Sequence, residues 1–89
     1  MNQTRTLSLQ VHVVEREADT TADVMLTLAS GEQVRGHGLS YRNPRDPDVP
    51  EIGDELAAAR ALSELSHRLV EAAAENISRR EHRDVHLTR

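Results

Sequence analysis

The sequence predicts one α+β domain in which a three-stranded antiparallel β-meander packs on one long α-helix, in the order β-β-β-α with a short C-terminal helix. Three observations support this fold class. Apolar and polar residues alternate with a period of two in three segments before residue 42, as in half-buried strands. Short polar segments join them, which favours antiparallel neighbours. After residue 50, apolar residues recur at steps of three and four, as on one face of an α-helix.

The first two strands are marked by regular alternation. Their apolar positions are Leu7, Leu9, Val11 and Val13 in the first strand and Ala22, Val24, Leu26 and Leu28 in the second. The charged and polar segment 15–21 between them predicts a hairpin connection. Each strand should therefore turn one apolar face toward the core and one more polar face to the other side of the sheet.

The third strand, expected over residues 33–41, has an interrupted pattern. Val34, Gly36 and Gly38 fall on one of its faces, whereas Leu39 falls on the other. A β-bulge at the two glycines would shift the phase and return Leu39 to the core. We therefore expect a bulge there, with close packing against the backbone as the alternative role of the two glycines.

A loop with three prolines precedes a long helix. The apolar stripe of this helix, which we expect to face the core, consists of Ile52, Leu56, Ala59, Leu62, Leu65, Leu69, Ala73 and Ile77. A single helix over residues 50–77 would be about 42 Å long, whereas strands of about nine residues span only ~30 Å. The helix must overhang the sheet or break, and Asn76 and Ser78 offer a break. We expect the long helix to end near residue 74 and a short second helix near residues 78–84.

The hydrophobic core must be thin. The chain has 89 residues, enough for one domain over 1–89, and they include no Phe or Trp, one Tyr, and 20 Leu, Ile or Val residues. Small domains bury a small share of their surface, so we expect the chain to complete its core as a homodimer. Such a core leaves little room for a pocket of ~300 Å³ or more, and we expect no cofactor and no small-molecule substrate. Residues 1–5 and 85–89 are expected to be flexible ends.

The sequence contains no cysteine, no apolar stretch long enough to span a membrane and no signal-peptide pattern, which predicts a cytoplasmic protein. No catalytic constellation stands out. Ser63, Ser66 and His67 are neighbours on one helix, where they cannot form a nucleophile, a base and an orienting group. His82 and His86 have the spacing of metal ligands but lack a third ligand. We therefore expect neither an enzyme nor a metal site.

All eleven basic residues are arginine, and the chain is acidic with a net charge of −4. An acidic chain is a poor general binder of nucleic acid, because affinity for phosphate grows with the number of cationic contacts. The charge is uneven, since residues 46–76 carry −6 and residues 77–89 carry +2. The basic end could contact phosphate or the acidic segment of a partner subunit, and both possibilities stay open.

A longer set of residues resembles a small actinobacterial family of unknown function. The residues that carry the resemblance, to which we assign structural roles, are Gly36, Gly38, Leu39, Asn43, Pro44, Pro50, Glu51, Ile52, Gly53, Asp54, Glu55, Leu56 and Arg60. The resemblance covers about residues 7–87. It implies a fold like that of double-stranded-RNA-binding domains, the formation of dimers, an association with dormancy and stress, and a likeness in fold to ribosome-hibernation factors. RNA-binding relatives place basic residues at the helix start, where this chain is acidic.

Two classes of function follow. The first is a non-enzymatic dimeric binding protein, associated with stress or dormancy, that acts on the ribosome or RNA. Its candidate contacts to nucleic acid or to a partner are Arg35, Arg42, Arg45, Arg79, Arg80 and Arg83. The second is a protein–protein adaptor that uses the acidic segment 46–55 or the open face of the sheet. An enzyme or a small-ligand protein is the least favoured class.

Overall fold

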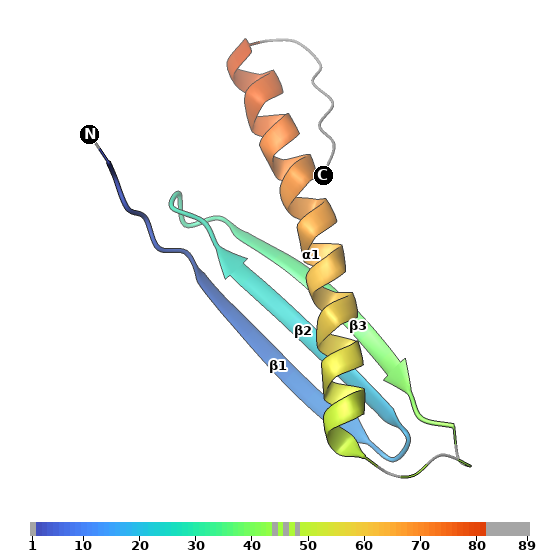
Figure 1. Cartoon of the computed structure of the whole chain (residues 1–89). Helices are drawn as coiled ribbons and strands as arrows, with labels where there is room; N and C mark the ends of the chain where they lie inside the picture. Colours follow the sequence, from blue (N-terminus) through green and yellow to red (C-terminus); the bar gives the residue numbers. More distant parts are fainter. Residues whose placement is uncertain (1, 44, 46, 48, 82–89) are drawn as a thin grey trace.

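The computed structural model describes residues 2–43, 45, 47 and 49–81. Three strands, β1 (Ser8–Arg16), β2 (Asp19–Thr27) and β3 (Gln33–Tyr41), form one antiparallel sheet in sequence order, and the helix α1 (Pro50–Glu81) crosses one face of it (Figure 1). The α+β class and the β-β-β-α order predicted from the sequence are confirmed. No helix in the part of the chain that the structure describes is long and apolar enough to cross a membrane.

Two tight turns set the register of the sheet. Arg16 pairs with Asp19, so the turn between β1 and β2 contains only Glu17 and Ala18. Glu17 has a φ of 53°, in the left-handed region that a non-glycine residue adopts at a cost of roughly 1–2 kcal/mol. In the turn between β2 and β3, Gly31 has a φ of 93°, which glycine adopts without this penalty. Each strand is therefore held directly against the next one.

The expected β-bulge does not form in β3, all of whose residues the structure describes. The pairing of β2 with β3 runs without interruption from Asp19 and Tyr41 to Thr27 and Gln33. Leu39 therefore stays on the open face of the sheet, the face away from α1, and the prediction that it returns to the core is wrong. The two glycines of β3 serve the close approach of the helix instead.

Gly36 and Gly38 bring the backbone of β3 against the backbone of α1. A Cβ at position 36 would lie 2.3 Å from the carbonyl oxygen of Ala61, and a Cβ at position 38 would lie 2.1 Å from the carbonyl oxygen of Ala57. Both distances are far shorter than the ~3.5 Å of an ordinary van der Waals contact. Ala57 and Ala61 are fully buried at this contact. The helix thus packs on the sheet through its smallest side chains.

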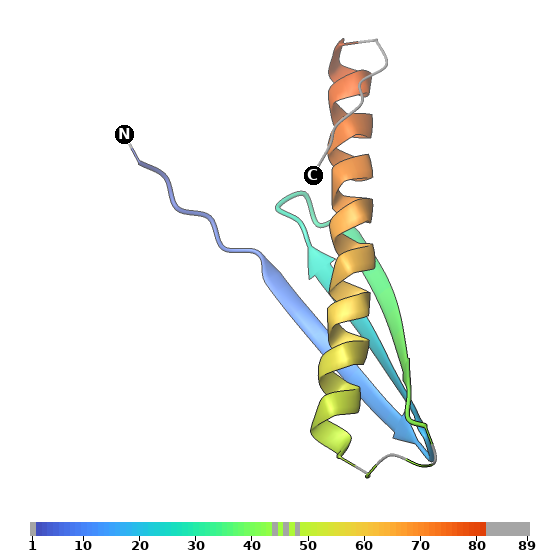
Figure 2. The ribbon, with the colours of Figure 1, turned by 45° about the vertical axis from the view of Figure 1, so that its right-hand side comes forward.

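The core is small and lies between β2, β3 and the first half of α1 (Figure 2). Its buried apolar residues are Ala22, Val24, Leu26, Val34, Ala57, Ala61 and Leu65, with Leu28 and Leu69 partly buried beside them. Within the apolar stripe predicted for the helix, Leu65 is buried, whereas Ile52, Leu56 and Leu62 are exposed. The prediction that the whole stripe faces the core is wrong, because the glycine contact turns the alanine face of α1 toward the sheet.

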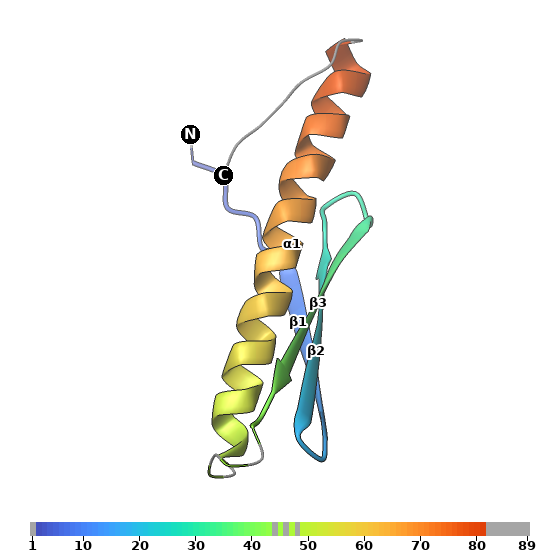
Figure 3. The same ribbon diagram turned by 90° about the vertical axis from the view of Figure 1, so that its right-hand side faces the viewer.

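The helix α1 continues for 32 residues, which is about 48 Å at 1.5 Å per residue. The predicted end near residue 74 and the separate helix from residue 78 are wrong over the described residues, and residues 82–84 lie outside them. Asn76 does not interrupt the helix, because its side-chain oxygen accepts a hydrogen bond from Arg79 and so does not compete for the backbone. The helix therefore overhangs the sheet at its C-terminal end (Figure 3).

Candidate interaction surface

Strand β1 carries a row of apolar side chains that the helix leaves uncovered. Leu9, Val11 and Val13 lie opposite buried residues of β2 and therefore point to the helix side of the sheet. They are nevertheless 45%, 45% and 38% exposed, because most of β1 lies to one side of α1 (Figure 2). We call these three residues, together with the 48% exposed Leu7 that precedes the strand, the β1 strip.

A second set of exposed aliphatic side chains belongs to α1 and the residue before it. Ile52, Leu56 and Leu62 are each more than a third exposed, because the helix contacts the sheet through other residues. Val49, which precedes the helix, is exposed to a similar degree. We call these four residues the α1 ridge. Single exposed apolar residues are ordinary on a protein surface, but these two sets together leave eight aliphatic side chains exposed in the described part of one small domain.

The helix covers one edge of the sheet and not the other. At the β3 edge, Arg60 donates to the carbonyl oxygen of Leu39 at 2.7 Å, and Glu64 Oε1 accepts from the backbone N–H of His37 at 3.2 Å. An ion pair of 3.3 Å between Arg68 and Glu64 holds the carboxylate in place. β1 forms the other edge, and no further strand of the described chain pairs with it. The β1 strip therefore lies beside an edge that is open to pairing.

The open face of the sheet is polar at its centre. His37 Nδ1 lies 2.8 Å from Asp23 Oδ1 on the neighbouring strand, and His12 is in register with Asp23 on the other side. The three side chains form one row across the sheet. Among the described residues, however, no group of three or more metal-ligating side chains could hold an ion. This row is a cross-strand polar contact of the kind that stabilises a solvated sheet face.

The arginines predicted to contact nucleic acid or a partner do not form one patch. They are Arg35, Arg42, Arg45, Arg79, Arg80 and Arg83. The first lies on β3, and the next two lie in the loop that leads to the start of α1. The following two are in the last turn of α1, at the far end of the helix (Figure 1), and the last lies outside the described residues. A continuous phosphate-binding surface made of all these side chains is therefore not assembled within one copy of the described chain.

Four residues of the expected family motif lie where α1 meets the sheet. Gly36, Gly38 and Arg60 make the contacts with β3 described above. A Cβ on Gly53 would lie 2.9 Å from Thr20 Oγ1, so this glycine lets the first turns of α1 approach β2. The others are Leu39 on the open face, Asn43 and Pro50 at the two ends of the loop, Glu51, Asp54 and Glu55 at the helix start, and Ile52 and Leu56 on the α1 ridge; Pro44 lies outside the described residues.

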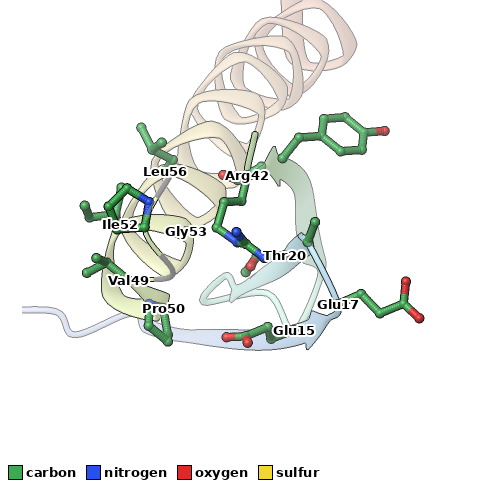
Figure 4. A pocket seen from close by; sticks show the side chains of 13 residues that line it. Glu15, Glu17, Thr20, Arg42, Val49, Pro50, Ile52, Gly53 and Leu56 are labelled. Atoms are coloured by element: carbon green, nitrogen blue, oxygen red, sulfur yellow. The ribbon is translucent and has the colours of Figure 1, made fainter. Parts of the chain in front are cut away.

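A cavity of about 370 Å³ opens between the turn that joins β1 to β2, the end of β3 and the start of α1 (Figure 4). The expectation that a thin core leaves little room for a pocket of this size is wrong. The cavity lies beside the core, and its lining includes Thr20 and Ser40 from the sheet, Arg42 from the loop, and Ile52 and Leu56 from the helix. Because these residues are far apart in the sequence, no local pattern predicts that they meet.

Reasoning from the sequence alone did not identify the β1 strip as a surface. Leu9, Val11 and Val13 alternate with polar residues as core positions do, and this alternation is the same in a covered and an uncovered strand. The residues that indicate the exposure of the β1 strip are in other elements: Ala57 and Ala61 on the helix and the two glycines of β3. A helix that packs through such small residues lies close to β3 and leaves the distant strand uncovered.

Comparison with known proteins finds chains that are similar to this one over most of its length. The family model described as Rv2632c-like matches residues 5–86. The uncharacterised protein Mb1767 of Mycobacterium bovis is 39% identical over 80 residues, which cover 90% of this chain and 84% of the relative. The uncharacterised protein Rv2632c of Mycobacterium tuberculosis is 38% identical over 81 residues, which cover 91% of this chain and 86% of the relative. The crystal structure of Rv2632c matches at 36% identity with a TM-score of 0.82, over 92% of this chain and 96% of that one.

Proposed function

The chain belongs to the Rv2632c-like family, and we propose that it is a non-enzymatic cytoplasmic protein that works as a homodimer and binds other proteins. The observation that carries this proposal is the β1 strip, an apolar row beside a sheet edge that no other strand in the described part of the chain covers. The core supports it as well. Among the described residues seven apolar side chains are buried and three of them are alanines, so one copy buries little apolar surface and would gain from association.

A second copy of β1 fits the β1 strip in two respects. Antiparallel pairing of the two β1 strands would satisfy backbone groups at both open edges and extend the sheet across the two copies. It would also place Leu9, Val11 and Val13 beside the same residues of the second copy, which removes apolar surface from water at roughly 25 cal/mol per Å². The register of such a pair is restricted, because a slip by one residue would turn the apolar row to the open face.

The first test is the mass of the protein in solution. Light scattering after size exclusion should give twice the chain mass of 9.9 kDa at micromolar concentration. The variant Val11→Asp, which places a charge in the middle of the β1 strip, should be monomeric. The matched control is Gln10→Asp, which adds the same charge to the same strand on the open face and should remain dimeric. A monomeric wild-type protein, or a dimer that Val11→Asp leaves intact, would contradict the proposal.

For a protein partner, the dimer would leave the acidic helix start and the open face of the sheet available. Glu51 and Glu55 are exposed in the first two turns of α1, while Asp46 and Asp48 lie outside the described residues. We expect a basic partner protein captured from ribonuclease-treated lysate to be lost when Glu51 and Glu55 are replaced by Gln. Capture that is unchanged in this double variant would exclude the acidic segment as the docking site.

A second candidate function is binding to the ribosome or RNA, with the dormancy and stress role and the RNA-binding-domain-like fold that the resemblance implies. The observation that favours it is the pair Arg79 and Arg80, which are exposed at the overhanging end of α1. Co-sedimentation with ribosomes should then fall steeply with salt, because cationic contacts to phosphate release counterions. The double variant Arg79→Ala and Arg80→Ala should lose pelleting at low salt. Pelleting that neither salt nor this variant affects would speak against phosphate contacts.

A further inference from the structure

We propose that the cavity under the start of α1 binds a small amphiphilic carboxylic acid, with its aliphatic body against the helix and its carboxylate against polar side chains of the sheet and the loop. The cavity holds about 370 Å³, which is at the small end of the ~300–1,000 Å³ typical of ligand pockets. None of the residues that line the cavity belongs to the β1 strip, although Glu15 of β1 lies at its mouth.

The aliphatic side of the cavity comes from the start of the helix. Val49, Ile52 and Leu56 line it together with Pro50, and Figure 4 shows these side chains on the helix side of the opening. Three of the four belong to the α1 ridge, so the ligand would cover apolar side chains that are otherwise exposed. An acyl chain is the simplest body that such a lining accepts, because it offers apolar surface without further polar groups to satisfy.

The polar side of the cavity contains two buried hydroxyls. Thr20 and Ser40 are 5% and 4% exposed, face each other in the register of β2 and β3, and both line the cavity. Among the described residues, neither hydroxyl has a hydrogen-bond partner. Every fully buried side-chain oxygen there does have a partner, so the oxygens of Thr20 and Ser40 are not fully buried. The two oxygens therefore reach the open space of the cavity. A hydroxyl in this position can donate a hydrogen bond to an anionic oxygen of a ligand.

Arg42 adds a cation to the same side. Its side chain lies across the cavity beside Thr20 in Figure 4, and its backbone N–H donates to the carbonyl oxygen of Ala18 at 2.8 Å, which ties the end of β3 to the turn. Arg42 already interacts within the chain. A guanidinium carries five N–H donors, so it can also donate a hydrogen bond to a ligand. Two hydroxyls and a guanidinium form a set of donors, and such a set favours a carboxylate.

Glu15 and Glu17 place two negative charges near the cavity, and these charges oppose the binding of an anion. Both are exposed at the mouth of the cavity, and Figure 4 shows Glu17 directed away from it. Their charges should repel an incoming anion at a distance that salt can screen. Replacement of Glu15 by Gln should therefore strengthen the binding of a carboxylic acid and weaken the binding of an amine of the same length. This contrast distinguishes recognition of the carboxylate from a non-specific affinity for apolar chains.

The test is a titration of the full chain with hexanoate, octanoate and decanoate at neutral pH, followed by backbone amide NMR. Saturable shifts should appear around residues 18–20, 40–42 and 53, with affinity rising with chain length. Thr20→Val keeps the side-chain shape but removes the donor, and it should weaken decanoate about tenfold, as expected for one hydrogen bond to a charged group. The matched control Thr21→Val lies on the open face of the same strand and should bind decanoate like the wild type.

Three results would overturn the proposal: no saturable shifts with any of the acids, equal affinities for Thr20→Val and Thr21→Val, or decylamine binding at least as tightly as decanoate. Circular dichroism melting of each variant confirms that a lost signal is not a lost fold. If Thr20→Val fails to fold, Glu15→Gln alone decides, because it is exposed and changes only the charge at the mouth. The Val11→Asp variant should bind decanoate like the wild type, so the dimer and the cavity are tested separately.

Discussion

Single residues decide how close α1 comes to the sheet. Gly36 and Gly38 remove the Cβ atoms that would otherwise lie 2.3 and 2.1 Å from helix carbonyl oxygens. The atoms in the way are backbone atoms of α1, which cannot rotate aside as a side chain can. Every larger residue at these two positions must therefore move the helix away from β3. The contacts of the helix alanines that close the core would then be lost.

The first prediction is that Gly38→Ala lowers the free energy of unfolding by about 3 kcal/mol or more, at the upper end of what overpacking costs. The control is His37→Ala, which changes the exposed residue between the two glycines and should cost about 0.5 kcal/mol. Urea unfolding of the two variants checks this. Equal stabilities would mean that the helix does not rest on the β3 backbone.

The strained turn residue gives a change of opposite sign. Glu17 has a φ of 53°, so Glu17→Gly relieves roughly 1–2 kcal/mol of strain, while the greater freedom of glycine in the unfolded chain offsets about 0.5–1 kcal/mol. We expect a net gain of up to about 1 kcal/mol in thermal or urea unfolding. Ala18→Gly in the same turn, where φ is not positive, should lose stability instead.

Within the elements, the period of the helix was predictable but its buried face was not. The three- and four-step pattern from Ile52 onward gives the helix correctly, yet three of its six large side chains, Ile52, Leu56 and Leu62, are exposed. By size and hydrophobicity, Leu56 and Leu62 are better candidates for burial than Ala57 and Ala61. The close contact with the two glycines of β3 admits only small side chains, so the alanines are buried and the leucines are not. A pattern taken from one element cannot reveal a constraint that belongs to its neighbour.

A matched pair of leucines tests which face is buried. Leu65 is 4% exposed and Leu62 is 39% exposed, so Leu65→Ala should cost about 2–5 kcal/mol and Leu62→Ala about 0.5 kcal/mol or less. Both should be measured by urea unfolding in the Val11→Asp background, where association does not contribute. Similar losses for the two variants would contradict the assigned face.

The strands were easier to predict than their surroundings. Alternation located β1 and β2 because side-chain direction repeats every two residues whatever lies above the sheet. The connection expected over residues 15–21 is wrong, since the strands continue to Arg16 and from Asp19, and in β3 the expected range is right but the bulge is not. The same alternation could not show that Val11 is uncovered while Val24 is buried, since both patterns look alike along the chain. It also could not foresee the cavity, which depends on a turn, a strand end, a loop and a helix start meeting in space.

At the scale of the whole molecule, the stability of one copy should reside in the first half of α1. The buried core ends at Leu65, with Leu69 partly buried, and the rest of the helix overhangs the sheet. A chain that ends after residue 75 should therefore unfold within about 1 kcal/mol of the full chain when both carry Val11→Asp. Calorimetry of the two proteins checks this, and a larger loss would show that the overhang packs on the folded copy.

The unequal edges of the sheet also determine how far assembly can proceed. Arg60 and Glu64 occupy backbone groups of β3, so a sheet that grows by strand addition can grow only from β1. When the β1 edges of two copies pair, neither copy keeps an open edge. The resulting dimer ends on both sides in a β3 strand that α1 covers. The association is then isologous and closed under a two-fold axis, in contrast to the head-to-tail contacts that build fibres. The double variant Arg60→Ala and Glu64→Ala would free these backbone groups in both copies, give the pair an open edge at each end and turn a finite complex into one that can polymerise.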